Sequence, residues 1–224
     1  MSSPPRAVAL VEGESDAEAV RAAAEVLGRD LVAERVEVVS LGGVTGVRRY
    51  LASRSFAGVR VAGLCDERES DDFDRALRVL DRHAVFVCRA DLEDELVRAT
   101  GPAGVEALLH EHGDLRAFRT LQSQPAHLGR PVEGQLRRFL GAGSGRKIRY
   151  GRLLVSALGP GSLPEPLRDL LAWVAPLALS GPPDGDMSTA NNPAPMGLLL
   201  RGPVGRSIGV RDDQSVAPGH LFCW

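Results

Sequence analysis

The stretch AVALVEGESDAEAV (residues 7–20) joins an apolar run to a helical pattern through one glycine. The apolar run predicts a buried strand at 7–12, and the periodicity that follows predicts a helix at 15–28, ended by Gly28. Glu12 stands at the end of the strand, where a carboxylate costs stability unless a cation or a hydrogen-bond donor holds it. We therefore expect Glu12 to serve a function rather than to fill space.

The same alternation of strand and helix continues through the first half of the chain. Further strands are expected at 36–41, 59–66 and 84–88, with helices at 45–55, 70–81 and from Asp91 to about Gly101. Alternation of this kind predicts an α/β fold with a four-stranded parallel sheet of Rossmann-like type, flanked by helices. In such sheets, ligand groups gather just beyond the carboxyl ends of the strands.

The pattern changes after Gly101. Helical periodicity alone is found up to residue 175, whereas residues 180–224 hold 13 Gly and Pro and show no sustained period. We expect an α/β core at 5–101, a helical subdomain with a basic patch at 102–178, and a disordered or loosely packed tail at 179–224.

Net charge is −2, but the charges are unevenly distributed. Residues 1–114 carry 14 Arg against 22 acidic residues, whereas residues 115–152 carry nine basic residues against Glu133 alone. This polarity favours cations beside the first segment and an anionic partner beside the second. A solvated charged surface is the alternative explanation.

The expected location is a reducing cytoplasm. No apolar run approaches the roughly 20 residues of a membrane span, and the first residues lack the order of a secretory signal. The three cysteines, Cys65, Cys88 and Cys223, are far apart and show no CxxC spacing. This spacing disfavours both structural disulfides and a thiolate zinc site.

Carboxylates follow three of the predicted strands: Glu12, Asp66 and Glu93. Asp16 lies one helical turn from Glu12, and Glu69 lies three residues beyond Asp66. At one edge of a parallel sheet these groups would raise each other's pKa unless a divalent cation neutralised them. Oxygen ligands select Mg²⁺ or Mn²⁺ over zinc, and one or two such ions can promote phosphodiester hydrolysis.

Lys147 is the only lysine in a chain with 26 arginines. A compact ammonium differs from a planar guanidinium, so this position has a distinct requirement, unless it is a chance surface lysine. Lys147 ends the glycine-rich segment GAGSGRK (141–147), which opens a predicted helix and offers backbone N–H groups to a phosphate. The expected phosphate-binding residues are Arg137, Arg138, Arg146, Lys147, Arg149 and Arg152.

The pieces LVEGESD, LCDERE, VCRADLEDELVRA and GRKIRYGRLLVSAL follow one another over roughly residues 5–160. Together they resemble the TOPRIM domain of topoisomerases, primases and RecR-like proteins, and specifically that of the OLD (overcoming lysogenization defect) nucleases. The resemblance implies that Glu12 and Asp16 hold a first metal ion. It further implies that Asp66 is the first acid of the family's D-x-D motif and Glu93 the acid of its L-E motif. Lys147 then stabilises charge on the transferring phosphate.

One position departs from the family pattern. The second acid of D-x-D is replaced by Arg68, with Glu67 and Glu69 on either side. Glu69 could reach the same ion by a longer route, and occupancy by two ions is in question.

The resemblance implies an Mg²⁺- or Mn²⁺-dependent DNA endonuclease or nickase, with Glu12 and Lys147 as catalytic residues. The sequence has no P-loop, since G-x-x-x-x-G-K-[ST] fails at Ile148, so an ATPase would be a separate partner. Two alternatives remain: a non-catalytic TOPRIM module that binds DNA or a partner, as RecR-like proteins do, and a nucleotidyl transferase of the primase kind.

Overall fold

The computed structural model describes residues 4–43 and 45–176, so the predicted tail at 179–224, with Cys223, lies outside the described residues. The strands are β1 (Ala7–Val11), β2 (Val36–Ser40), β3 (Arg60–Asp66) and β4 (His83–Cys88). The 3₁₀ helices are η1 (Glu67–Glu69) and η2 (Pro160–Ser162). The α-helices are α1 (Glu14–Val26), α2 (Thr45–Ala52), α3 (Ser70–Leu77), α4 (Leu92–Glu111), α5 (Leu115–Gln122), α6 (Val132–Leu140), α7 (Ser144–Ala157) and α8 (Glu165–Val174).

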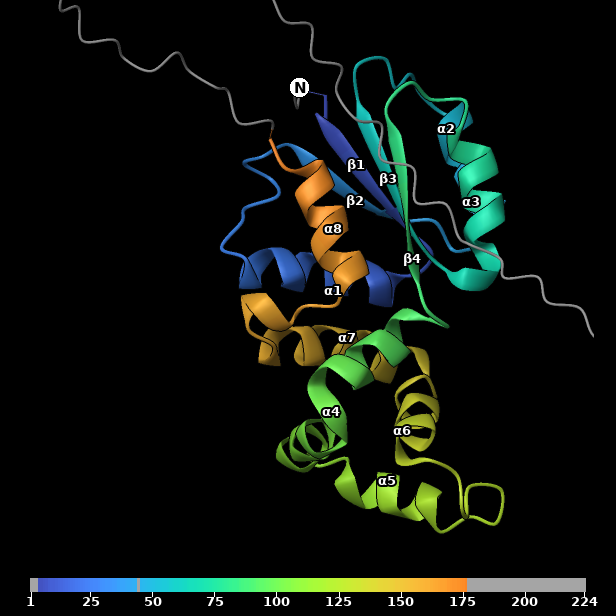
Figure 1. Cartoon of the computed structure of the whole chain (residues 1–224), viewed down its shortest axis with the longest axis vertical. Helices are drawn as coiled ribbons and strands as arrows, with labels where there is room; N and C mark the ends of the chain where they lie inside the picture. Colours follow the sequence, from blue (N-terminus) through green and yellow to red (C-terminus); the bar gives the residue numbers. More distant parts are fainter. Residues whose placement is uncertain (1–3, 44, 177–224) are drawn as a thin grey trace, which may run out of the picture. The chain divides into compact units, whose positions relative to one another are not determined.

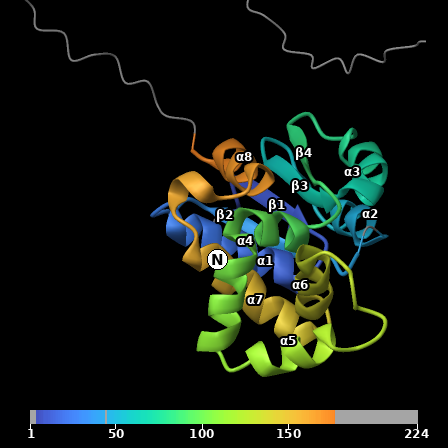
Figure 2. The same cartoon turned by 60° about the horizontal axis from the view of Figure 1, so that its bottom comes forward.

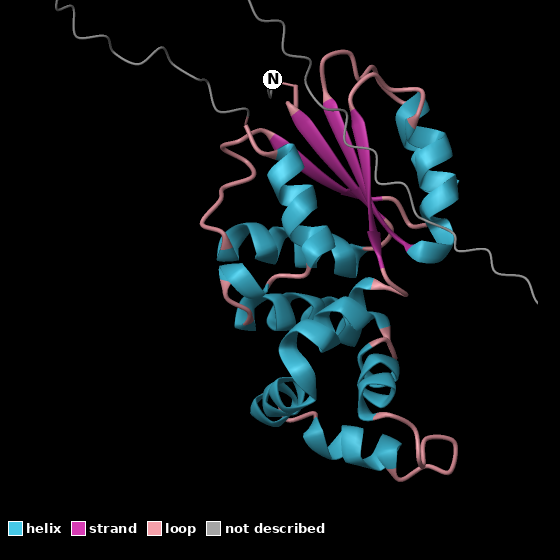
Figure 3. Ribbon diagram, in the orientation of Figure 1, coloured by secondary structure: helices cyan, strands magenta, loops and turns pink. Residues whose placement is uncertain are grey.

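The four strands form one sheet (Figure 3). All neighbouring strands are parallel, and their order is β2-β1-β3-β4. The α/β fold with a four-stranded parallel sheet, predicted from the sequence, is therefore confirmed. Val11 at the end of β1 lies opposite Leu64 of β3, and Asp66 lies opposite Cys88 of β4. The carboxyl ends of all four strands consequently meet at one edge of the sheet.

Both faces of the sheet are covered, which explains why β1 is apolar throughout. Ala7, Ala9 and Val11 pack on the side of α1 and α8, whereas Val8 and Leu10 pack on the side of α2 and α3 (Figure 1). All five residues of β1 are fully buried. A strand buried on both faces needs apolar side chains at every position, because its residues alternate between the two faces.

Helix α7 lies along α1, below the sheet in the view of Figure 1 and beside α1 again in Figure 2. Buried alanines on α1 and Gly151 on α7 allow this approach: a Cβ atom on Gly151 would lie 3.1 Å from the carbonyl oxygen of Ser15. The contact places the start of α7, with Lys147, beside the start of α1, with Asp16.

Helix α4 is interrupted at Gly101, which has a φ of 72° and is followed by Pro102. The predicted domain boundary at residue 101 therefore falls at a kink between two helical segments that abut directly. Two further differences concern the segment after β3. Residues 67–69 form the unpredicted helix η1, and α3 ends at Leu77 rather than at residue 81, because a turn there returns the chain to β4.

Within the described residues, no helix is long and apolar enough to cross a membrane. The thiols of Cys65 and Cys88 are free and buried.

Candidate active site

Glu12 and Asp66 lie side by side at the carboxyl edge of the sheet. Glu12 directly follows β1, and Asp66 is the last residue of the neighbouring strand β3. The backbone N–H of Asp66 donates a hydrogen bond of 2.7 Å to Oε1 of Glu12. The sheet register thus brings together two acids that are 54 positions apart in the sequence.

Asp16 joins this pair from the first turn of α1. Its Oδ2 accepts a 2.9 Å hydrogen bond from the N–H of Gly13, which holds the carboxylate at the amino end of the helix. Carboxylates at this end of a helix are stabilised by the free N–H groups and the helix dipole.

Helix η1 decides which residue after Asp66 points inward. Arg68 is exposed, whereas Glu69 is partly buried. Burial raises the pKa of Glu12, and the nearby charge of Glu69 adds to that rise. Oε2 of Glu69 is buried and has no hydrogen-bond partner among the described residues. The tight 3₁₀ turn therefore brings the third residue after Asp66, rather than the second, toward the other acids.

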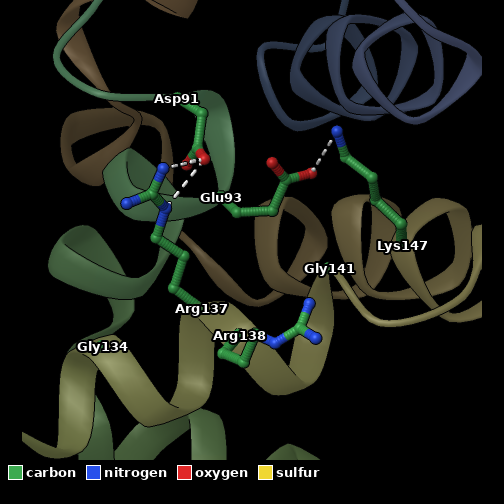
Figure 4. A pocket seen from close by; sticks show the side chains of 7 residues that line it. All are labelled: Asp91, Glu93, Gly134, Arg137, Arg138, Gly141 and Lys147. Carbon is green, nitrogen blue, oxygen red and sulfur yellow. Dashed lines mark hydrogen bonds and ion pairs between the residues drawn. The ribbon is translucent and has the colours of Figure 1, made fainter. Parts of the chain in front are cut away.

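The amino end of α4 brings two more acids, and both are paired with basic groups. Asp91 caps the helix, accepting a 2.8 Å hydrogen bond from the N–H of Asp94, and also accepts one of 2.7 Å from Nε of Arg137. Glu93 is 8% exposed, and its Oε1 lies 3.3 Å from Nζ of Lys147 (Figure 4). These contacts connect α4 with α6 and α7.

A cavity of about 390 Å³ lies between these helices, and acids and bases line it together (Figure 4). Arg138 is exposed and makes no ion pair within the part of the chain that the structure describes. The lining residues are Asp91, Glu93, Gly134, Arg137, Arg138, Gly141 and Lys147.

A second, much smaller space of about 10 Å³ lies among the strand-end acids. That volume is about what one water molecule needs. Burial raises the pKa of the Cys65 thiol to about 12 and also raises that of Cys88, so both thiols stay protonated. The available donors are therefore carboxylate oxygens, which fit Mg²⁺ or Mn²⁺. The lining residues are Glu12, Asp16, Leu64, Cys65, Asp66, Cys88 and Leu92.

The acids at this edge of the sheet have raised pKa values in the folded chain. Burial, followed by the charge of Glu12, raises the pKa of Asp66 to about 7. Burial likewise raises the pKa values of Glu12, Asp16 and Glu93. Burial opposes the charge on Lys147, but the carboxylates of Glu93 and Asp16 outweigh it and raise the pKa of Lys147. A bound cation would relieve the repulsion that the charges of Glu12 and Asp16 exert on Asp66.

The acids lie near one another, but their carboxylates do not converge on one position where an ion could bind. Within residues 4–43 and 45–176, no three His, Cys, Asp or Glu side chains are arranged to hold a metal ion. The Glu12 carboxylate, for example, faces the Asp66 N–H. Ion binding would therefore require side-chain rotation at this edge of the sheet.

The predicted phosphate-binding residues divide into two groups. Lys147 and Arg138 line the larger cavity, together with Arg137, whose guanidinium is bound by Asp91. The others lie elsewhere in contacts of their own. Arg146 donates to the carbonyl oxygens of Phe139 and Ala142, Arg149 pairs with Asp114, and Arg152 pairs with Glu25.

Known proteins resemble this chain in sequence over its first strands and in fold over most of its length. Residues 6–67 match the family model described as overcoming lysogenization defect protein-like, TOPRIM domain. The C-terminal region of the Burkholderia pseudomallei OLD protein is 20% identical, with a TM-score of 0.55 over 76% of this chain and 96% of that one. The C-terminal region of the Xanthomonas campestris pv. campestris OLD protein is 22% identical, with a TM-score of 0.55 over 76% of this chain and 92% of that one. No curated protein sequence matches. The resemblance to the OLD TOPRIM domain, inferred from the motifs, is thus confirmed.

Proposed function

We propose that this chain is a Mg²⁺- or Mn²⁺-dependent DNA endonuclease or nickase of the OLD-like TOPRIM type. One observation carries the proposal: Glu12, Asp16 and Asp66 lie together at the carboxyl edge of the sheet and form no ion pair among the described residues, with Lys147 nearby. Buried carboxylates without a cation are costly, and a divalent ion would neutralise them. Because these 224 residues contain no P-loop, we propose that any ATPase acting with them is supplied by other residues.

In this proposal Glu12, Asp16 and Asp66 hold the ion, and the wider set predicted from the sequence adds Glu69 and Glu93. A bound Mg²⁺ or Mn²⁺ would supply charge neutralisation and would make water a better nucleophile. The water oxygen forms a bond to phosphorus, the bond from phosphorus to one ester oxygen breaks, and that oxygen gains a proton. The products are a phosphomonoester end and a hydroxyl end.

We propose that Lys147 stabilises negative charge on the phosphate. Its ammonium is a single compact positive charge at the boundary between the acids and the larger cavity, and it is 37% exposed. Negative charge that develops on the phosphate oxygens in the transition state would be stabilised by such a fixed charge. Arg138 in the same cavity adds attraction to the DNA backbone that is independent of sequence.

The direct test is conversion of supercoiled plasmid to nicked circles by the purified full chain in millimolar Mn²⁺ and in EDTA. We expect Mn²⁺-dependent nicking that Glu12→Gln abolishes. Glu111→Gln is the matched control, because Glu111 is exposed at the far end of α4 and makes no ion pair within the described residues. Equal nicking by the wild type and Glu12→Gln would assign the activity to a contaminant.

A non-catalytic TOPRIM module that binds DNA or a partner is the second candidate. Arg68 at the position of the second D-x-D acid favours it, as does the lack of a converged three-carboxylate group among the described residues. Calorimetric titration with Mn²⁺ separates the two functions. Binding that Asp66→Asn removes supports the nuclease, and DNA binding without any Mn²⁺ binding supports the module.

A further inference from the structure

The acids at the carboxyl edge fall into two groups that differ in their partners. Asp91 and Glu93, both from α4, are already paired with Arg137 and Lys147. Glu12, Asp16, Asp66 and Glu69 make no ion pair within the described residues. Only the second group therefore makes no direct ion pair with a protein cation. The charge of Lys147 acts on Asp16 and Asp66 from farther away, so this group has the greater need of an ion from solution.

Space and ligands at the strand ends suit a single ion. The space lined by Glu12, Asp16 and Asp66 has room for about one water molecule. The residue two positions after Asp66 is an exposed arginine, and Glu69 turns toward Glu12, on the side of the unpaired acids. Glu69 would thus add its oxygens to the acids that would hold the first ion.

Of the described acids at this edge, those left for a second ion are Asp91 and Glu93, and both are paired: Arg137 binds Asp91, and Lys147 binds Glu93. The Glu93 side chain is 10% exposed, and it contacts the Lys147 ammonium at 3.3 Å (Figure 4). An ion ligated by Glu93 would either displace that ammonium or lie next to it, and two cations at such range repel each other strongly in a partly buried site. Desolvation of Glu93 makes loss of its partner costly as well.

We propose that the site takes one divalent ion and that Glu93 is a positioning residue for Lys147, whose ammonium takes the place of a second ion. The inference rests on the proposed nuclease function and deepens it. In this arrangement, one positive centre is held by the strand-end acids and the other is covalently part of the chain. The phosphate lies between them.

The test measures Mn²⁺ stoichiometry on the full chain by calorimetry and by electron paramagnetic resonance. We expect one Mn²⁺ per chain, with no coupling between two ions. Glu93→Gln should leave stoichiometry unchanged and Mn²⁺ affinity within about threefold, while kcat falls by about 10- to 100-fold with little change in KM for DNA. Asp66→Asn should remove Mn²⁺ binding.

If Glu93→Gln fails to fold, Lys147→Met tests the same ion pair by removing the other partner. It should lower kcat as Glu93→Gln does, and the double variant should be no worse than either single variant, because both remove one functional unit. Two ions per chain, with one lost in Glu93→Gln, would overturn this inference and leave the nuclease intact. Absence of any Mn²⁺ binding or nicking by the wild type would overturn both.

Discussion

The backbone N–H of Asp66 donates a 2.7 Å hydrogen bond to the Glu12 carboxylate, joining the ends of two adjacent parallel strands. The bond favours the ionised form of Glu12, although burial raises the pKa of this residue. It also fixes the direction of one carboxylate oxygen. The sheet itself, rather than a loop, therefore orients the central acid of the site.

The first prediction concerns stabilisation by metal. Millimolar Mn²⁺ should raise Tm, because an ion that binds only the folded chain stabilises it and relieves repulsion among Glu12, Asp16 and Asp66. Glu12→Gln should lose most of the increment, whereas Glu111→Gln should keep it. Thermal denaturation with and without Mn²⁺ measures both. An equal increment in Glu12→Gln would remove Glu12 from the site.

A second prediction concerns pH in the absence of metal. The pKa of Asp66 is about 7 in the folded chain, against a reference value of 3.8. Between these values the folded chain binds more protons than the unfolded chain, so this group makes stability fall as pH rises from about 4 to about 7. In EDTA, Asp66→Asn should show a smaller decrease in Tm over that range than the wild type.

Asp71→Asn, an exposed acid on α3, serves as the control for the pH series and should retain the wild-type slope. If Asp66→Asn and the wild type show the same dependence of Tm on pH, Asp66 titrates at its ordinary value and the unpaired acidic group is weakly coupled. Mn²⁺ affinity of the wild type should rise over the same range, since the ligands must be deprotonated to bind.

The sequence predicted the sheet and the acids at its edge because both follow from local pattern. A buried strand ended by a carboxylate is visible within six residues, and parallel alternation then fixes where Glu12 and Asp66 meet. Whether the side chain of Arg68 points toward the acids or into solvent could not be predicted in the same way. A single 3₁₀ turn, η1, determines whether position 68 or 69 points inward, and short 3₁₀ segments carry little sequence signal.

The ion-pair partners of the predicted basic patch could not be predicted from the sequence either. Its arginines looked alike in sequence, but their partners are distant: Arg137 is bound by Asp91, 46 positions away, and Arg152 by Glu25, 127 positions away. Pairings of this kind depend on how α4, α6 and α7 pack together. Periodicity identifies each helix without fixing which helices become neighbours.

A third prediction concerns the contact between α1 and α7. A Cβ atom on Gly151 would lie 3.1 Å from the backbone oxygen of Ser15, which cannot move without moving α1. Gly151→Ala should therefore lower the free energy of unfolding by about 1–3 kcal/mol, as overpacking does. It should also reduce nicking, since Lys147 lies one turn earlier on α7.

Gly145→Ala is the matched control on the same helix, because a Cβ atom there meets nothing within 4 Å. It should raise the free energy of unfolding by up to about 1 kcal/mol, the usual gain when alanine replaces a helical glycine. Urea denaturation measures both variants. Destabilisation by Gly145→Ala equal to that by Gly151→Ala would mean that the close approach of α1 and α7 is not the cause.

The last prediction separates two adjacent arginines that the sequence could not distinguish. Arg138 is exposed, lines the larger cavity and makes no ion pair among the described residues, whereas Arg137 is bound by Asp91. Arg138→Ala should weaken DNA binding and make its salt dependence shallower by about one counterion, with kcat at saturating DNA nearly normal. Arg137→Ala should chiefly cost stability, because it leaves Asp91 without its cation. Salt-dependent binding titrations and urea denaturation of both variants give the two readouts, and an unchanged salt slope in Arg138→Ala would place the DNA backbone elsewhere on the chain.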